Sequence, residues 1–524
     1  MTITRRTLIH QVGRAGGVAA AYRTMAAMGL LAVPAAHSEP PSLPPNSDGG
    51  GPIVILGAGI AGMVAALELQ RAGYDCNILE ARARPGGRNW SLRAGDTVAE
   101  ASTIQTVAWD AEPHLYFNPG PARLPFHHQG ILGYCRELGV PLEVMCNDNR
   151  GALMQDDQAF DGRPQRNAAV VNDSRGYVAE LAAKAVDHGL LDAPVSDQDR
   201  ERLHGFLRAF GALDHDMAYR GSARSGYLEP SGGGLTAGKI VPPLDLRRLV
   251  QADFWQGPSE FGEFYSMAAT MMQPVGGMGR IGEAFGRRLG DVITYNAEVT
   301  QLRRQGDGAQ VVWRDRRSNQ VSVVEAAHVL CTIPCPVLRR LDTDFSSAVR
   351  AALAAVDYVP AGKIAFQADR RFWELDAQIY GGISWTSRDI TQIWYPSAGL
   401  QQARGILVGA YIWSDDLGHA FAAKAPDARI ADALADGEHL HPGYGKSLRH
   451  AISVAWPNIP FNEGAWAEWT SEARAQAYPV LLDGDGPFTF AGEHLSHITG
   501  WQEGAVVSAH YAIARITERI KAAN

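Results

Sequence analysis

The residues Ile53-Val54-Ile55-Leu56-Gly57-Ala58-Gly59-Ile60-Ala61-Gly62 form the most informative segment of this chain. Its four apolar residues predict a buried parallel strand, and its glycines have the spacing of a dinucleotide-binding turn. Gly57 allows the tight turn, Gly59 lets the backbone approach the phosphates, and Gly62 lets helix and strand pack closely. A helix is predicted over residues 60–71, with its free N–H groups and positive dipole end directed at the phosphates.

Three further fragments belong with this turn. Cys76-Asn77-Ile78-Leu79-Glu80 predicts the next strand, and Glu80 lies where a carboxylate accepts hydrogen bonds from ribose hydroxyls. Near the other end of the chain stand Phe490-Ala491-Gly492-Glu493 and Gly500-Trp501-Gln502-Glu503-Gly504-Ala505, which open a last helix near residue 502. An ordinary strand–turn–helix corner explains neither Glu80 nor the Gly86-Gly87 pair.

These fragments resemble the flavin-containing amine oxidases. The resemblance lies in the run from Glu80 to Arg88 (EARARPGGR), the two C-terminal fragments, the segment 274–280 (PVGGMGR) and Glu298-Val299. It extends from about residue 52 to the last helix and implies FAD as cofactor. The predicted cofactor contacts are Gly57, Ala58, Gly59, Ala61, Gly62, Glu80, Ala81, Arg82, Gly87, Arg88, Ala122, Arg123, Val299, Trp456, Gly492, Glu493, Trp501, Gln502 and Ala505.

The implied architecture is an α/β (α+β) fold with a discontinuous, glutathione-reductase-like Rossmann domain for FAD. Apolar residues at helical spacing over 172–211 predict a helical insertion. Segments 363–367, 393–395 and 406–413 are rich in β-branched and aromatic residues and predict a mixed sheet beside the substrate. We assign residues 51–104, 274–345 and 485–524 to FAD binding, 105–150, 236–273 and 346–484 to the substrate domain, and 151–235 to the insertion.

Composition excludes several classes of function. A chain of 524 residues with a net charge of −8 is globular and multi-lobed, and its charge argues against nucleic acid or an anionic membrane as partner. The five cysteines and sixteen histidines show no metal-binding spacing, so no metal site is predicted. A homodimer is possible only by analogy with relatives.

The N-terminus resembles a twin-arginine export signal. Thr4-Arg5-Arg6-Thr7-Leu8-Ile9 precedes a weakly apolar run, which suggests a signal over residues 1–38 and a proline-rich linker over 39–50. This predicts a periplasmic or secreted protein. The alternative is a tail on a cytoplasmic protein, in which the two arginines are adjacent by chance.

The substrate is suggested by Gly120-Pro121-Ala122-Arg123-Leu124-Pro125. This segment is similar to the one in L-amino acid oxidases whose arginine binds the substrate carboxylate; the alternative is a surface arginine in a turn. By the same resemblance, Tyr395 gives that carboxylate a third hydrogen bond, and Lys363 holds a water at the reactive flavin nitrogen. Burial beside the flavin is expected to lower the pKa of Lys363.

The segment from Trp456 to Trp466 resembles the place where monoamine oxidases carry a flavin-linked cysteine. Ala465 occupies that position here, so we expect FAD to be bound non-covalently. Trp466 and Trp501 resemble aromatic walls on either side of the substrate amine, and the Gly500 carbonyl is the expected acceptor for its N–H. Core packing is the alternative for both tryptophans.

The resemblance implies an FAD-dependent L-amino acid oxidase that converts hydrophobic or aromatic amino acids, with dioxygen, to 2-oxo acids, ammonia and hydrogen peroxide. Three alternatives stay open at this point. They are a flavin amino-acid 2-monooxygenase of the tryptophan 2-monooxygenase type, an amine or polyamine oxidase, and a binding protein in which flavin is only structural.

Overall fold

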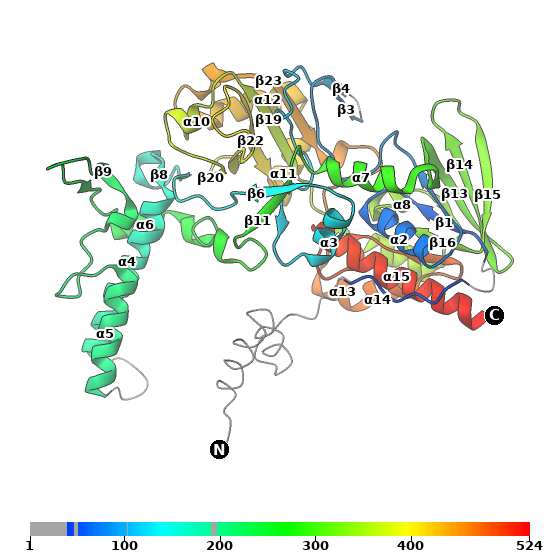
Figure 1. The fold of residues 1–524 in the computed structure, drawn as a ribbon, viewed down its shortest axis with the longest axis horizontal. Coiled ribbons are helices and arrows are strands. Elements are labelled where there is room, and N and C mark those ends of the chain that lie inside the picture. The colour runs from blue at the N-terminus through cyan, green and yellow to red at the C-terminus, as the bar shows by residue number, and fades with distance from the viewer. Residues whose placement is uncertain (1–38, 47–50, 102, 190–195, 524) are drawn as a thin grey trace, which may run out of the picture.

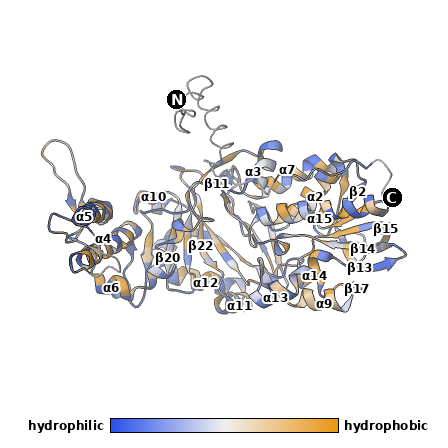
Figure 2. Ribbon diagram, turned by 90° about the horizontal axis from the view of Figure 1, so that it is seen from below, coloured by the Kyte–Doolittle hydropathy of each residue, from blue (hydrophilic) through white to orange (hydrophobic). Residues whose placement is uncertain are grey.

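The computed structural model describes residues 39–46, 51–101, 103–189 and 196–523. The predicted export signal and part of the predicted linker lie outside these residues. The described chain forms three parts in a row, with a parallel sheet at one end, a large mixed sheet in the middle and a helical part at the other end (Figures 1 and 2). In this part of the chain, none of the helices combines the length and the apolar character that a bilayer crossing requires.

The first part is built on a five-stranded parallel sheet of strand order β12-β2-β1-β16-β25. Its strands come from three separate stretches of the chain, as the predicted discontinuous Rossmann-like domain requires. The strands are β1 (Ile53–Leu56), β2 (Cys76–Glu80), β12 (Ile293–Tyr295), β16 (His328–Cys331) and β25 (Phe488–Phe490).

Alternate residues of β1 point to opposite faces of this sheet, and both faces are covered. Ile53 and Ile55 lie in a core with four helices, and Val54 and Leu56 lie in a core with a four-stranded sheet. The helices are α2 (Ile60–Arg71), α3 (Gln129–Glu137), α7 (Gly279–Leu289) and α15 (Gln502–Ala523); the sheet is β15 (Val321–Ala326), β14 (Gly308–Asp315), β13 (Ala297–Gln305) and β17 (Asp342–Thr343). Burial on both faces explains why β1 is apolar throughout.

The middle part is a seven-stranded sheet with both parallel and antiparallel neighbours, as predicted. In spatial order its strands are β23 (Leu448–Ala455), β19 (Gly362–Ala368), β22 (Gly405–Ile412), β21 (Gln392–Tyr395), β20 (Gly382–Thr386), β7 (Leu153–Gln155) and β8 (Gln165–Arg166). Helices α11 (Asp415–Ala423) and α12 (Pro426–Gly437) pack against it. A small sheet, β5 (Leu124–Pro125), β11 (Met271–Pro274) and β6 (Leu142–Met145), lies beside it.

The helical part contains α4 (Asn167–Asp187), α5 (Asp197–Gly211) and α6 (Leu246–Gln251). The helices predicted over residues 172–211 are present as α4 and α5. The N-terminal part of the segment 151–235, which we assigned to the insertion, is not α-helical. Residues 153–155 and 165–166 instead form β7 and β8 of the mixed sheet. The other predicted boundaries stay predictions.

Candidate active site

A cavity of about 620 Å³ runs from the carboxyl ends of β1 and β2 to one face of the mixed sheet. Gly57 and Glu80 line its first end, and Lys363 of β19, Trp394 of β21 and Tyr411 of β22 line the second. Ligands bind at the carboxyl ends of parallel strands in folds of this kind. The cavity therefore joins the predicted dinucleotide site to the predicted substrate site.

The glycine turn has the geometry that its sequence predicted. Gly57 has a φ of +104°, a conformation that few other residues adopt. A Cβ on Gly62 would lie 2.1 Å from the Gly57 carbonyl oxygen, so only glycine allows α2 to approach β1 this closely. A Cβ on Gly59 would meet no atom within 4 Å, and Gly59 lines the cavity. That open space is where a dinucleotide phosphate can approach the backbone.

Glu80, at the end of β2, is 4% exposed and bonds to the backbone of the glycine turn. Its carboxylate accepts hydrogen bonds from the backbone N–H of Ala58 at 2.7 Å and of Arg82 at 2.8 Å. The carboxylate is thereby fixed in orientation at the cavity wall, where a ribose can donate to it.

All but two of the predicted cofactor contacts line the cavity. The residues that do are Gly57, Gly59, Ala61, Glu80, Ala81, Arg82, Gly87, Arg88, Ala122, Arg123, Val299, Trp456, Gly492, Glu493, Trp501, Gln502 and Ala505. Ala58 and Gly62 do not, because the Ala58 amide is bonded to Glu80 and Gly62 faces β1. Both residues shape the turn instead of lining its open side.

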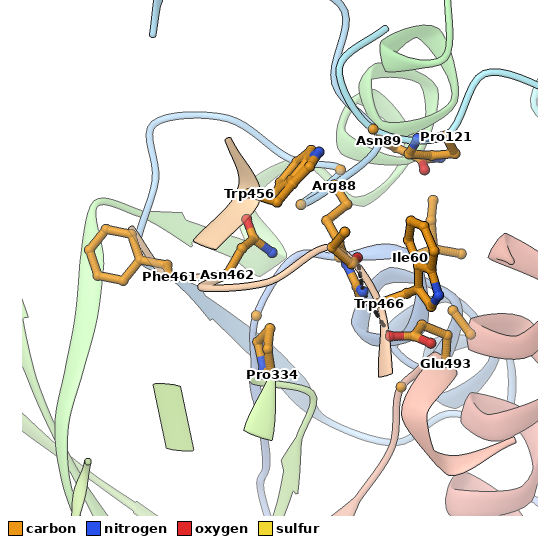
Figure 3. A pocket seen from close by; sticks show the side chains of 18 of the residues that line it. Ile60, Arg88, Asn89, Pro121, Pro334, Trp456, Phe461, Asn462, Trp466 and Glu493 are labelled. Carbon is orange, nitrogen blue, oxygen red and sulfur yellow. Dashed lines mark hydrogen bonds and ion pairs between the residues drawn. The ribbon is translucent and has the colours of Figure 1, made fainter. Parts of the chain in front are cut away.

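Arg88 and Glu493 form an ion pair at the middle of the cavity (Figure 3). Arg88 Nη1 donates to Glu493 Oε1 at 2.7 Å and to the Ala465 carbonyl at 2.8 Å. Glu493 Oε2 accepts from the Gly500 N–H at 2.9 Å. Burial would lower the pKa of Arg88, but Glu493, Tyr358 and Cys335 together outweigh it, so the pKa is raised. One carboxylate thus links the cofactor end of the cavity to the loop that carries Gly500 and Trp501.

Arg123 is 7% exposed and reaches into the second end of the cavity. Its guanidinium lies 4.8 Å from the Trp394 ring centroid and 5.3 Å from that of Phe261. Nη1 donates to Asn147 Oδ1 at 2.6 Å. Burial lowers the pKa of Arg123 to about 10, so the group stays protonated at neutral pH. No carboxylate of the described residues forms a salt bridge with it, which leaves its charge available for an anionic ligand.

Lys363 is 3% exposed and lies close to Arg123. Its Nζ donates to the carbonyls of Gly120 at 2.6 Å and Asn118 at 3.1 Å, and lies 4.4 Å from the Tyr411 ring centroid. Burial, and then the charge of Arg123, lowers its pKa to about 7. A lysine with this pKa can bind or release a proton near neutral pH.

The prediction that Tyr395 contacts a bound carboxylate is wrong. Side chains alternate along a strand, and it is Trp394 that lines the cavity. The Tyr395 hydroxyl bonds to Ser384 Oγ at 2.7 Å and His441 Nε2 at 2.6 Å in a buried cluster. The tyrosine that faces Arg123 is Tyr411, on the neighbouring strand β22.

Trp466, Gly500 and Trp501 all line the cavity, and a Cβ on Gly500 would lie 3.3 Å from the Trp466 ring. That the two tryptophans flank a substrate amine stays a prediction. Ala465 also lines the cavity, and no cysteine is among its described lining residues. The side chains present therefore fit a flavin held without a thioether.

Sequence analysis missed the wall at the nucleotide end. Residues 332–334 follow β16, the neighbour of β1, so the rule that ligands bind at strand carboxyl ends could have found them. Residues 460–463 carried no such signal. Arg82 Nη2 donates to the Pro460 carbonyl at 2.6 Å, and Glu463 pairs with Arg340. Phe461, Asn462 and Pro334 all line the cavity (Figure 3).

Comparison with known proteins agrees with this geometry. The model of the family described as flavin containing amine oxidoreductase matches residues 60–517. The L-amino-acid oxidase of Siganus canaliculatus is 28% identical over 485 residues, 89% of this chain and 85% of that protein. The flavin-dependent L-tryptophan oxidase of Lentzea aerocolonigenes is 27% identical over 496 residues, 88% of this chain and 97% of that protein.

A solved structure of wild-type putrescine oxidase bound to putrescine matches with a TM-score of 0.59 and 18% identity. The match covers 90% of this chain and 99% of the other. At this identity the likeness establishes the fold alone.

Proposed function

Because the chain belongs to the flavin-containing amine oxidoreductase family, we propose that it is an FAD-dependent L-amino acid oxidase. The proposed substrates are hydrophobic and aromatic L-amino acids, and the products are 2-oxo acids, ammonia and hydrogen peroxide. The observation that carries this proposal is the buried guanidinium of Arg123, which meets aromatic rings and a neutral amide but no acid of the described chain. Full-length similarity to two proteins named as L-amino acid and L-tryptophan oxidases supports it.

The carboxylate end of the substrate is bound by Arg123. A planar guanidinium matches a carboxylate with two parallel hydrogen bonds, which a plain amine cannot use. Tyr411 lines the same end of the cavity and can donate a third. Met267, Trp394 and Trp413 then surround the side chain with apolar surface.

The amine end of the substrate lies toward Gly500. Its carbonyl accepts the amine N–H, and Glu493 fixes the preceding peptide through the Gly500 N–H at 2.9 Å. Trp466 and Trp501 exclude water from this end of the cavity. The α-hydrogen is thereby directed toward the cofactor end.

FAD would be held by the glycine turn at its phosphates and by Glu80 at its ribose. The chemistry supplied by the bound cofactor is hydride acceptance and reoxidation by dioxygen. Only a neutral amine can yield the imine, so the rate should rise with pH as the substrate amine loses its proton. Lys363, with a pKa of about 7, holds or releases a proton at its Nζ beside the reacting groups.

The test is an anaerobic titration of the FAD-loaded protein with L- and D-amino acids and the corresponding amines, followed by product analysis in air. We expect L-amino acids to bleach the flavin absorbance and to yield 2-oxo acid and peroxide. Amide and carbon dioxide would identify a monooxygenase instead. Equal reaction of the decarboxylated amines would identify an amine oxidase.

Arg123→Ala should lower kcat/KM for L-amino acids. The loss of transition-state stabilisation should be roughly 2 to 5 kcal/mol, as for the loss of a buried charge partner. The matched control is Arg474→Ala. Arg474 also stacks on aromatic rings and donates to a carbonyl, that of Ser496 at 2.8 Å, but does not line the cavity. Near-normal amino acid turnover by Arg123→Ala would refute the carboxylate site.

A further inference from the structure

Asn147 is a buried side chain that joins Arg123 to the backbone of a second residue of the cavity wall, Met267. It follows β6, is 5% exposed and does not line the cavity itself. Its Oδ1 accepts from Arg123 Nη1 at 2.6 Å, and its Nδ2 donates to the Met267 carbonyl at 2.8 Å. Met267 lines the cavity, so one amide connects two lining residues that are distant in sequence.

The orientation of this amide is fixed by its partners. A guanidinium can only donate and a carbonyl can only accept, so the Asn147 oxygen must face Arg123 and the nitrogen must face Met267. Pairing of β6 with β11, in which Met145 lies opposite Met271, holds both segments in register next to the site. The guanidinium is thus aimed by an acceptor that carries no charge.

This differs from how the chain buries its other arginines. Three arginine side chains are buried in the described part of the chain, Arg123, Arg371 and Arg429. Arg371 pairs with Glu374 at 2.6 Å, and Arg429 pairs with both oxygens of Glu100 at 2.9 and 3.0 Å. At Arg123 the partner is asparagine, which has the shape of aspartate without its charge.

We propose that Asn147 is a positioning residue that makes the cavity select amino acids over amines, because it aims the Arg123 guanidinium without neutralising it. An acid at this position would hold the same cation and compete with the substrate carboxylate. This inference rests on the proposed function. It extends that function by assigning the preference for amino acids over amines to Asn147, a residue that does not line the cavity.

The test compares Asn147→Asp with the unchanged enzyme on L-tryptophan and tryptamine, which differ only in the carboxylate. We expect kcat/KM for L-tryptophan to fall by about 30-fold or more, as for loss of a buried charge pair. Reaction with tryptamine should change by less than about threefold, because it makes no contact with the guanidinium. Benzoate, titrated by its perturbation of the flavin spectrum, should bind about 30-fold more weakly, a readout that needs no turnover.

Asn149→Asp is the matched control. Asn149 makes the same kind of bridge two residues further on, from the Gly151 N–H at 2.8 Å to the Gly381 carbonyl at 2.8 Å, away from the cavity. This change should leave the ratio of the two substrates unaltered. Asn147→Ser, which keeps a neutral acceptor, should retain more benzoate affinity than Asn147→Asp.

Should Asn147→Asp fail to fold, Asn147→Ala replaces it: benzoate affinity equal to that of the unchanged enzyme would then overturn the inference. An equal loss toward both substrates in Asn147→Asp would reduce Asn147 to a structural role and overturn it too. An unchanged enzyme that oxidises neither L-tryptophan nor any other amino acid refutes the proposed function itself. An unchanged L-tryptophan to tryptamine ratio in an active Asn147→Asp refutes only the role of Asn147.

Discussion

The same added methyl group should lower the stability of the apoprotein at one glycine of the turn, Gly62, and not at another, Gly59. In Gly62→Ala the new Cβ would lie 2.1 Å from the Gly57 carbonyl oxygen and 3.2 Å from Ile55 Cγ2. Carbon atoms normally stay well over 3 Å from such neighbours, so α2 must withdraw by about 1 Å. Because α2 is buried along residues Ile60–Leu69, it has little room to move.

The cost of such overpacking is about 1 to 3 kcal/mol. We therefore expect the Gly62→Ala apoprotein to unfold at a lower temperature than the unchanged apoprotein. In Gly59→Ala the new Cβ meets no protein atom within 4 Å, and the backbone φ of −75° suits alanine. Its apoprotein should be close to normal in stability.

Measuring FAD affinity apart from apoprotein stability distinguishes a local effect on the cofactor site from a general folding defect. Both should bind FAD at least about tenfold more weakly, Gly62→Ala because the helix end has moved and Gly59→Ala because the methyl occupies the phosphate approach. Tm of the deflavinated proteins and quenching of FAD fluorescence on titration measure the two effects. Normal FAD affinity in Gly59→Ala would show that the phosphates bind elsewhere. A normal apoprotein Tm in Gly62→Ala would refute the packing argument.

Two further predictions concern buried charge. Glu100→Ala should lower the free energy of unfolding by about 3 to 5 kcal/mol, because it leaves Arg429 buried without its bidentate partner. A loss of unfolding free energy under about 1 kcal/mol in a denaturant titration would contradict this. Lys363→Met should raise apoprotein Tm most at acidic to neutral pH, since the folded pKa of about 7 lies below the ordinary lysine pKa of about 10.4. Between these two pKa values the unfolded chain binds more protons than the folded chain, so the stability of the unchanged protein rises with pH over that range. The difference in Tm between the variant and the unchanged protein must therefore shrink toward pH 10. A pH-independent difference in Tm would mean that Lys363 keeps an ordinary pKa.

The nucleotide end of the site was predictable because its chemistry is encoded locally. The strand, the glycine turn and α2 are contiguous, and Glu80 follows at a spacing that the motif itself sets. The glycine turn and the helix end have the geometry that a pyrophosphate requires, and Glu80 has the position that a ribose requires. The predicted helix over residues 60–71 accordingly coincides with α2.

The substrate end was less predictable because it is built from strands that are buried on both faces. All four residues of β21 are buried, so the sequence offers no apolar–polar alternation from which to choose the face of Trp394 or Tyr395. An error of one residue moves a side chain to the opposite face. For this reason Tyr395 was assigned to the cavity although its neighbour Trp394 lines it, and Asn147 was missed because its partners are distant in sequence.

Helical spacing predicted the existence of α4 and α5 but not what they bury. Val178 is 59% exposed and Phe206 is 61% exposed, although both follow the apolar period of their helices. The helices meet through another set of residues, among them Ala179, Ala183, Val186 and Leu207. Periodicity identifies a helix, whereas the face that is covered depends on the rest of the fold.

Charge at the substrate end argues for a zwitterion over a simple amine. Arg123 stays protonated, and Lys363 is partly protonated near its pKa of about 7. Of the acidic residues that line the cavity, Glu80, Glu298 and Glu463 lie at its nucleotide end, and Glu493 is already paired with Arg88. A diamine would bring positive charge to buried cations and find no anion of the described chain there, which costs free energy in a low-dielectric site. An amino acid supplies the missing anion and needs only its amine proton removed. The preference for amino acids over amines should therefore weaken when a carboxylate at position 147 neutralises the charge of Arg123.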